Sequence, residues 1–180
     1  MQRLSLLDYR RMLEGGIIPA DANIELIDGR IYAMPPISSA HAAVLTRLAQ
    51  SFFAQAAVTK RAVVWHQNPI EILPDSAPQP DLALLQWRDD CYCDALPGSA
   101  DILLVVEVAD STLARDLSKL LTYARAGIPE AWLIDVQGKT LSVARNPSPQ
   151  GYCSVATADG SVSPLHFPDL SVDLTALLRR

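Results

Sequence analysis

The chain has 180 residues, enough for a substantial hydrophobic core, and we expect a single domain spanning residues 1–180. Hydrophobic residues make up 49% of the sequence and charged residues 19%, a composition that excludes an intrinsically disordered chain. The longest apolar run is too short to cross a membrane. The formal net charge of −5 argues against a uniformly basic nucleic-acid-binding surface, although a local basic face can coexist with a negative total.

The cysteines and the first residues of the chain indicate the compartment. Cys91, Cys93 and Cys153 make an odd number, and no second cysteine pair or histidine cluster completes a zinc pattern. The leucines of the first segment alternate with Asp, Glu and Arg, which is not the pattern of a secretory signal. We therefore expect a reduced, cytoplasmic protein.

The first third of the chain alternates between helical and extended patterns. Residues 5–14 have leucines at helical spacing and are followed by a glycine pair, which predicts a helix that ends at Glu14. Asp28-Gly29 separates two short apolar segments, a strong indication of a β-hairpin. A second helical pattern follows, with Ser38 or Ser39 as its N-cap.

The remainder predicts a sheet with further helices. The segments AVVWHQ, IEIL, DLALLQW, LLVVEV and AWLID read as strands, and a helix is expected from Thr112 or Leu113 to Ala126. The glycine- and proline-rich C-terminal part predicts a meander of short strands and a short terminal helix. The fold class expected is mixed α/β (α+β), with a central sheet flanked by helices.

Two acidic residues occupy unusual places in this pattern. Asp81 opens an apolar strand directly after Pro80, and Glu107 lies near the end of the most apolar strand, 107 − 81 = 26 residues later. If the two strands are neighbours, both carboxylates face one point. Two convergent carboxylates and a backbone carbonyl form a site for Mg²⁺, which prefers oxygen ligands. Such a site would compensate the burial of Glu107.

The helix after this strand adds a cation. Asp116, Lys119 and Tyr123 are spaced by three and four positions, so they share one helical face. If that face returns over the strand ends, Lys119 can stabilise the charge of an attacked phosphate or help to deprotonate a water. Carboxylates and a lysine around Mg²⁺ indicate phosphodiester hydrolysis.

Each of these residues also has a plainer interpretation. Asp81 after a proline suits a turn, Glu107 at a strand end can reach solvent, and Lys119 in an amphipathic helix is commonly a solvated charge. Glu25, between Ile24 and Leu26, suits a solvent-facing strand position. His41 near a helix start suits a capping or surface group, and Tyr123 a packing residue with its hydroxyl at the surface.

Four stretches in the same order resemble a known family: ELIDGRIYAMPPISSAH, PQPDLALL, LLVVEVADST and KLLTYARAGIPEAWLIDV. They are similar to the Uma-two family of restriction-endonuclease-like proteins, within the PD-(D/E)xK nuclease superfamily, over residues 4–136. The resemblance implies a restriction-endonuclease-like core. It also implies that Asp81 and Glu107 are metal ligands, assisted by the backbone carbonyl of Val108.

The sequence departs from the superfamily pattern at one position. The lysine of that pattern stands two residues after the second acid, where this chain has Ala109. The resemblance then implies Lys119, on the next helix, as the migrated substitute.

Four further residues match other positions of the family. Glu25 matches an early acidic position and is expected to add a ligand. His41 is expected to orient a water or a phosphate. Asp116 and Tyr123 also match, with their roles left open.

The first function hypothesis is a DNA endonuclease that depends on Mg²⁺ (or Mn²⁺). We expect it to form a homodimer and not to associate with a membrane. A second hypothesis is a catalytically inactive binding or assembly module on the same fold, favoured by the acidic net charge and by Ala109. A third is a metal-dependent hydrolase that acts on another phosphoester.

Overall fold

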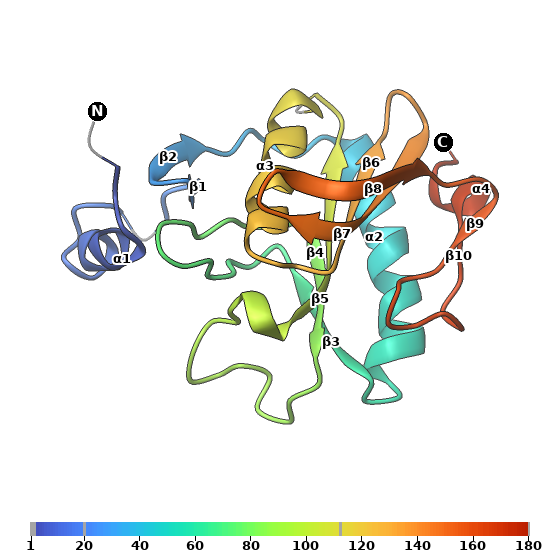
Figure 1. Cartoon of the computed structure of the whole chain (residues 1–180), viewed down its shortest axis with the longest axis horizontal. Coiled ribbons are helices and arrows are strands. Elements are labelled where there is room, and N and C mark those ends of the chain that lie inside the picture. Colours follow the sequence, from blue (N-terminus) through green and yellow to red (C-terminus); the bar gives the residue numbers. More distant parts are fainter. Residues whose placement is uncertain (1–2, 20, 112, 180) are drawn as a thin grey trace.

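A computed structural model describes residues 3–19, 21–111 and 113–179, and its elements are arranged around one sheet (Figure 1). The helices are α1 (Leu6–Glu14), α2 (Ser39–Phe52), α3 (Leu113–Arg125) and α4 (Leu174–Leu177), with a π-helical turn at Phe53–Ala57 and a 3-10 turn at Ser99–Asp101. The strands are β1 (Ile24–Ile27), β2 (Arg30–Ala33), β3 (Ala62–His66), β4 (Leu82–Gln86), β5 (Ile102–Ala109), β6 (Glu130–Asp135), β7 (Thr140–Ser148), β8 (Gly151–Thr157), β9 (Ser161–Val162) and β10 (Val172–Asp173).

The central sheet has six strands in the order β3-β4-β5-β6-β7-β8. Its pairs are antiparallel except β5 and β6, which run parallel and are joined by α3. A parallel pair requires a crossover connection, and a helix is the usual one. The crossover places α3 directly after the carboxyl end of β5, the strand that carries Glu107.

Strand β5 lies in the middle of two hydrophobic layers. Side chains alternate between the faces of a strand, so Leu104, Val106 and Val108 pack with α2 and the C-terminal segment. Val105 and Ala109 pack on the opposite face, with α3. Glu107 belongs to this second set by its position, so its carboxylate points toward α3.

The first helix and the β1–β2 hairpin form a smaller unit beside the sheet (Figure 1). Ser5 caps α1 and exchanges hydrogen bonds with Asp8 in a capping box. The hairpin is joined to the segment that precedes β4, because Leu26 and Ala77 exchange both backbone hydrogen bonds. This pairing holds β1 next to the start of β4.

The fold class and most elements agree with the sequence-based expectations. The mixed α+β class is confirmed, as are the α1 helix, the Asp28-Gly29 hairpin and Ser38 as the N-cap of α2. Helix α3 is found at Leu113–Arg125, and Thr112 lies outside the described residues.

One predicted strand was wrong. The segment IEIL, residues 70–73, forms only isolated bridges, because its backbone bonds to Pro97 and to Ser76 in a tight reversal. Ile70 and Ile72 are still buried in the core, so the apolar residues of this segment reflect burial rather than a strand.

The C-terminal part contains more sheet than expected. The predicted meander of short strands begins with β7 and β8, which have 9 and 7 residues and extend the central sheet. Only β9 and β10, with two residues each, and the four-residue α4 are short. The central sheet is therefore wider than the sequence pattern indicated.

The helices of the described ranges are all too short or too polar to span a lipid bilayer. Cys91, Cys93 and Cys153 are exposed free thiols.

The packing of α2 against the sheet predicts which substitutions lower the free energy of unfolding. Leu48 is fully buried under the sheet, whereas Leu117 on α3 is 52% exposed. We expect Leu48→Ala to lower the free energy of unfolding by about 2–5 kcal/mol, because it leaves a cavity. Leu117→Ala should change it by less than about 0.5 kcal/mol. Urea-induced unfolding followed by circular dichroism measures both, and equal effects would contradict this assignment of the core.

Candidate active site

The carboxyl end of β5, the start of β4 and one face of α3 meet at a cavity of about 310 Å³. Asp81, Glu107 and Lys119 all line it. The strand register explains the convergence: β4 and β5 are antiparallel neighbours with Leu82 opposite Val106. Asp81, one residue before β4, therefore lies beside the end of β5.

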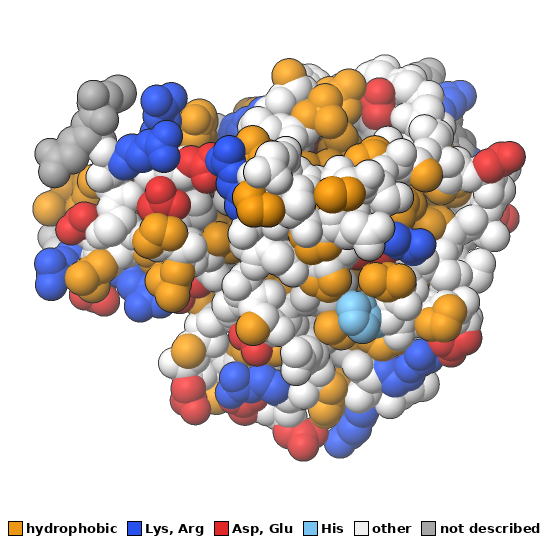
Figure 2. Space-filling view, viewed as in Figure 1, with side chains coloured by type: hydrophobic (Ala, Val, Ile, Leu, Met, Phe, Trp, Pro, Cys, Tyr) orange, Lys and Arg blue, Asp and Glu red, His pale blue; other side chains and the backbone are white. Residues whose placement is uncertain are grey.

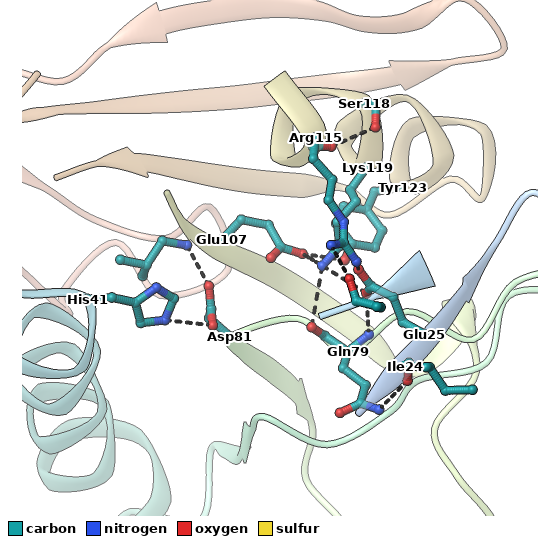
Figure 3. A network of polar contacts seen from close by, with 12 residues as sticks. Ile24, Glu25, His41, Gln79, Asp81, Glu107, Arg115, Ser118, Lys119 and Tyr123 are labelled. Carbon is teal, nitrogen blue, oxygen red and sulfur yellow. Dashed lines mark hydrogen bonds and ion pairs between the residues drawn. The ribbon is translucent and has the colours of Figure 1, made fainter. Parts of the chain in front are cut away.

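Glu107 is buried among partners that come from α3. Its side chain is 2% exposed, and Oε1 lies 2.7 Å from Lys119 Nζ. The same oxygen accepts a hydrogen bond from the Tyr123 hydroxyl (Figure 3). Both donors sit on one helical face, four residues apart. The predicted face of α3 is confirmed, and the interpretations of Glu107, Lys119 and Tyr123 as solvent-directed groups were wrong.

Lys119 is enclosed by acceptors on three sides. Besides Glu107, Nζ lies 3.2 Å from Glu25 Oε2 and donates to the Gln79 carbonyl at 3.3 Å. The side chain is 3% exposed, and an ammonium carries three N–H donors. Lys119 is therefore enclosed by the carboxyl groups of Glu107 and Glu25 and the backbone carbonyl of Gln79.

Ala109, where the resemblance led us to expect a lysine, is part of the hydrophobic core. Ala109 is 1% exposed and packs in the hydrophobic layer under α3. It shares the face of Glu107, two residues away. The ammonium that meets Glu107 comes instead from α3, through Lys119.

Glu25 is buried and holds two cations together. Its Oε1 accepts a hydrogen bond from Arg115, and its Oε2 accepts one from the Gln79 backbone N–H at 3.2 Å and contacts Lys119 (Figure 3). The interpretation of Glu25 as a solvent-facing strand residue was wrong, since its side chain is 2% exposed. The alternation with Ile24 and Leu26 was real, but the side chain faces the cavity.

Asp81 connects β5 with α2. One oxygen accepts a hydrogen bond from the Val108 backbone N–H at 2.7 Å, and the other lies 2.9 Å from His41 Nε2. His41 stands in the first turn of α2, where its backbone N–H donates to the N-cap hydroxyl of Ser38. His41 therefore contacts Asp81 and is not a surface group. Asp81 in turn links β5 to α2, a role beyond forming a turn.

The Val108 carbonyl has a defined direction. The ladder between β4 and β5 ends at Leu82 and Val106, so Val108 lies beyond the last paired residue of β4. In an antiparallel ladder the N–H and C=O of one residue point to the same neighbour. Because the Val108 N–H points at Asp81, its carbonyl is directed to the same side, where the cavity lies.

Two further residues at the cavity were not identified from the sequence. Arg115 bonds to Glu25 and donates to the Ala33 carbonyl at 2.7 Å, so it ties α3 to both strands of the hairpin. Asp110 at the cavity edge accepts from the Ser38 hydroxyl at 2.6 Å. Arg115 stands four residues before Lys119, so the helical spacing already indicated that it shares the face of the predicted site.

Burial and neighbouring charges set the protonation of the site. Burial raises the pKa of Glu107 to about 8, against the attraction of Lys119, and the charges of Asp81 and Asp116 add to the increase. Burial alone would lower the pKa of Lys119, but the carboxylates of Glu107 and Glu25 raise it above its usual value. Burial also raises the pKa of Tyr123 well above normal, so its hydroxyl keeps its proton.

His41 responds to the same cluster of acids. Burial lowers the pKa of His41, but the hydrogen bond and charge of Asp81, with the charges of Asp116 and Asp110, raise it above the ordinary value of 6.5 overall. Asp116 is itself buried at the start of α3 and lines the cavity. Its carboxylate belongs to the electrostatic environment of both Glu107 and His41.

A family model described as "Uma2: Putative restriction endonuclease" matches residues 6–176. The chain belongs to the Uma2 family. The resemblance seen in the four sequence motifs is thereby confirmed, and so is the assignment to a family described as endonucleases.

A solved structure supports the fold of this Uma2 chain. It is described as a "putative nuclease belonging to DUF820 from Anabaena variabilis ATCC 29413", and its crystal structure superimposes with a TM-score of 0.76. The sequences are 17% identical, and the match covers 97% of each chain. No functionally curated protein matches the sequence.

The raised pKa of Glu107 predicts how the metal-free protein responds to pH. Between the ordinary pKa of 4.5 and about 8, the folded protein retains a proton on Glu107 that the unfolded chain releases. The free energy of unfolding should therefore fall as pH rises through this window, by at most about 1.4 kcal/mol per pH unit for this one proton.

This pH dependence is measured by urea unfolding in EDTA at several pH values from 5 to 8. The Glu107→Gln variant is the control, because glutamine cannot titrate. We expect the slope against pH to be shallower in the variant. Parallel slopes in the two proteins would contradict the raised pKa.

Proposed function

We propose that this protein is a metal-dependent DNA endonuclease that hydrolyses phosphodiester bonds in the cavity between β4, β5 and α3. The observation that carries the proposal is the convergence of Asp81, Glu107 and Lys119, far apart in sequence, within one cavity. Membership of the Uma2 family and the nuclease description of the structural neighbour support the reaction class.

The donor set of the cavity fits a hard divalent cation. Among the described residues that line it, acidic side chains outnumber the basic side chains of Arg115 and Lys119. The five acids are Glu25, Asp81, Glu107, Asp110 and Asp116. Oxygen ligands and an excess of negative charge are what Mg²⁺ or Mn²⁺ requires. Asp81, Glu107 and the Val108 carbonyl are the groups that would hold it. Bound there, the cation would supply Lewis-acid polarisation of a phosphoryl oxygen and a more acidic water.

Lys119 acts in this proposal through its charge rather than as a base. A raised pKa keeps the ammonium protonated at neutral pH, so it cannot remove a proton from water. Its three acceptors hold the charge in a fixed position beside Glu107. A preorganised positive charge stabilises the negative charge that develops on an attacked phosphate.

Glu25 and His41 position the groups around them. The two oxygens of Glu25 contact Arg115, Lys119 and the Gln79 backbone N–H, so we propose that Glu25 holds the side chain of Lys119 in position. Its role as an additional metal ligand stays a prediction. His41 orients the carboxylate of Asp81 and presents a second ring nitrogen for a water or a phosphate oxygen.

The metal-binding part of the proposal is tested by calorimetric titration with Mn²⁺. Wild-type protein should bind the ion, and Asp81→Asn and Glu107→Gln should each abolish detectable binding, because each removes an anionic ligand. Asp159→Asn, at an exposed position, is the matched control and should bind as the wild type does. Equal binding by all four proteins would contradict the assignment of the ligands.

The catalytic part is tested with DNA and MgCl₂ or MnCl₂. Lys119→Met should lower the rate of cleavage by about 100-fold or more, because it removes the preorganised charge. Lys139→Met, an exposed lysine in the turn before β7, should leave the rate unchanged. Undiminished cleavage by Lys119→Met, with the protein folded as judged by circular dichroism, would exclude this role for Lys119.

A specific observation favours a second candidate, a catalytically inactive module on the nuclease fold. The ammonium of Lys119 is fully occupied by protein acceptors, and Ala109 replaces the usual lysine. An inactive module predicts no Mn²⁺ binding and no loss of function in Glu107→Gln. The homodimer expected from the sequence is compatible with either candidate function. Analytical ultracentrifugation would measure the oligomeric state.

A further inference from the structure

The cavity has a rim that the proposed chemistry does not use. The segment that follows strand β2 lines the opening, where Met34, the two prolines after it and Ile37 provide an apolar wall. Ile37 is exposed and lines the cavity at the same time. An apolar wall contributes nothing to binding a cation, so it requires another explanation.

Tyr32 lies on the cavity side of the hairpin. It stands directly opposite Glu25 in the β1–β2 register, and cross-strand partners project to the same face. Glu25 lines the cavity, so Tyr32 points to that side as well. The residue is 38% exposed, and the Arg115 guanidinium lies 5.6 Å from the centroid of its ring.

An exposed aromatic ring beside a guanidinium is a surface on which a nucleobase stacks. Single-stranded nucleic acids are held in this way, by aromatic side chains and planar arginines, whatever the base. Arg115 and Ile37 line the cavity, and the ring of Tyr32 lies beside Arg115, next to the opening. A base stacked on the exposed part of the Tyr32 ring, beside Arg115, would leave its own phosphate directed toward the cavity.

The charge around the cavity argues against a duplex as the bound form. Binding to duplex DNA depends on many lysine and arginine contacts to phosphates. Of the described residues that line the cavity, Arg115 and Lys119 are the cationic ones, and both are already paired with Glu25. On the face seen in Figure 2, basic and acidic side chains are interspersed without a broad basic area.

The size and depth of the cavity point the same way. Its volume of about 310 Å³ is at the small end of the range for small-molecule sites, roughly 300–1,000 Å³. Glu107 and Lys119 are almost completely buried at its base. A recess of this size is filled by a single nucleotide.

We propose that the cavity admits one unpaired nucleotide, with its base stacked on Tyr32 and Arg115, and that the substrate is therefore single-stranded or locally unpaired DNA. The substrate class rests on the proposed nuclease function, but the stacking surface is a binding site that can be measured without cleavage.

Binding is measured by fluorescence anisotropy with labelled dT10 and with a duplex of the same length, at one salt concentration and in EDTA. Wild-type protein should bind dT10 more tightly than the duplex. Tyr32→Leu should raise the Kd for dT10 by about 5- to 100-fold, because it removes one stacking contact. Tyr32→Phe keeps the ring and should stay within about twofold.

Ile31→Ala serves as the matched control in the same strand. Ile31 is exposed to the same degree as Tyr32 but projects to the opposite face, so this variant should bind dT10 as the wild type does. Thermal melting of each variant separates a loss of stacking from a loss of folding. Equal affinity of Tyr32→Leu and wild type, or duplex binding as tight as dT10 binding, would overturn the inference.

Cleavage distinguishes this inference from the proposed function. With MnCl₂, a circular single strand should be cut faster than a relaxed duplex circle. Cutting of both circles at equal rates would contradict the single-strand preference and leave the nuclease assignment standing. Cutting of neither circle, with the Tyr32→Leu effect on dT10 binding intact, would refute the nuclease and keep the nucleotide site.

Discussion

The contact between Lys119 and the two buried carboxylates of Glu25 and Glu107 is the interaction on which the site depends. It joins three elements from distant parts of the sequence: the first hairpin, the central strand β5 and the crossover helix α3. Burying any one of these charges alone would be strongly unfavourable. The three elements must therefore pack together, and the cavity exists because they do.

The alternation of strand side chains determines which residues can take part. The side chain of Glu107 faces α3, because its neighbours Val106 and Val108 face α2 and side chains alternate along a strand. Asp81 reaches the same place because β4 starts where the β5 ladder ends. A shift of either strand by one residue would turn its acid to the other side of the sheet. The hydrophobic layers thus fix the position of the acidic groups.

Much of the fold could be predicted because its elements are marked locally. Gly15-Gly16, Ser38 and Asp28-Gly29 indicate a helix end, a helix start and a turn from a few neighbouring residues. The acids were recognised because carboxylates are rare in apolar strands. The orientation of Glu25 and the role of Arg115 could not be predicted, since both depend on how the hairpin docks against α3. The failure of IEIL has the same origin, because its backbone partners lie in distant loops.

The hairpin strand β2 combines proximity to the cavity with a lack of buried side chains, since all four of its residues are exposed. Substitutions there remove little packing, so they have small effects on stability. The proposed ligands and Lys119, by contrast, stand on buried elements that tolerate little change. This separation would let the proposed substrate-binding surface diversify while the acids and the lysine of the cavity stay fixed. Variation among related chains is therefore expected to concentrate in β2 and the loop after it.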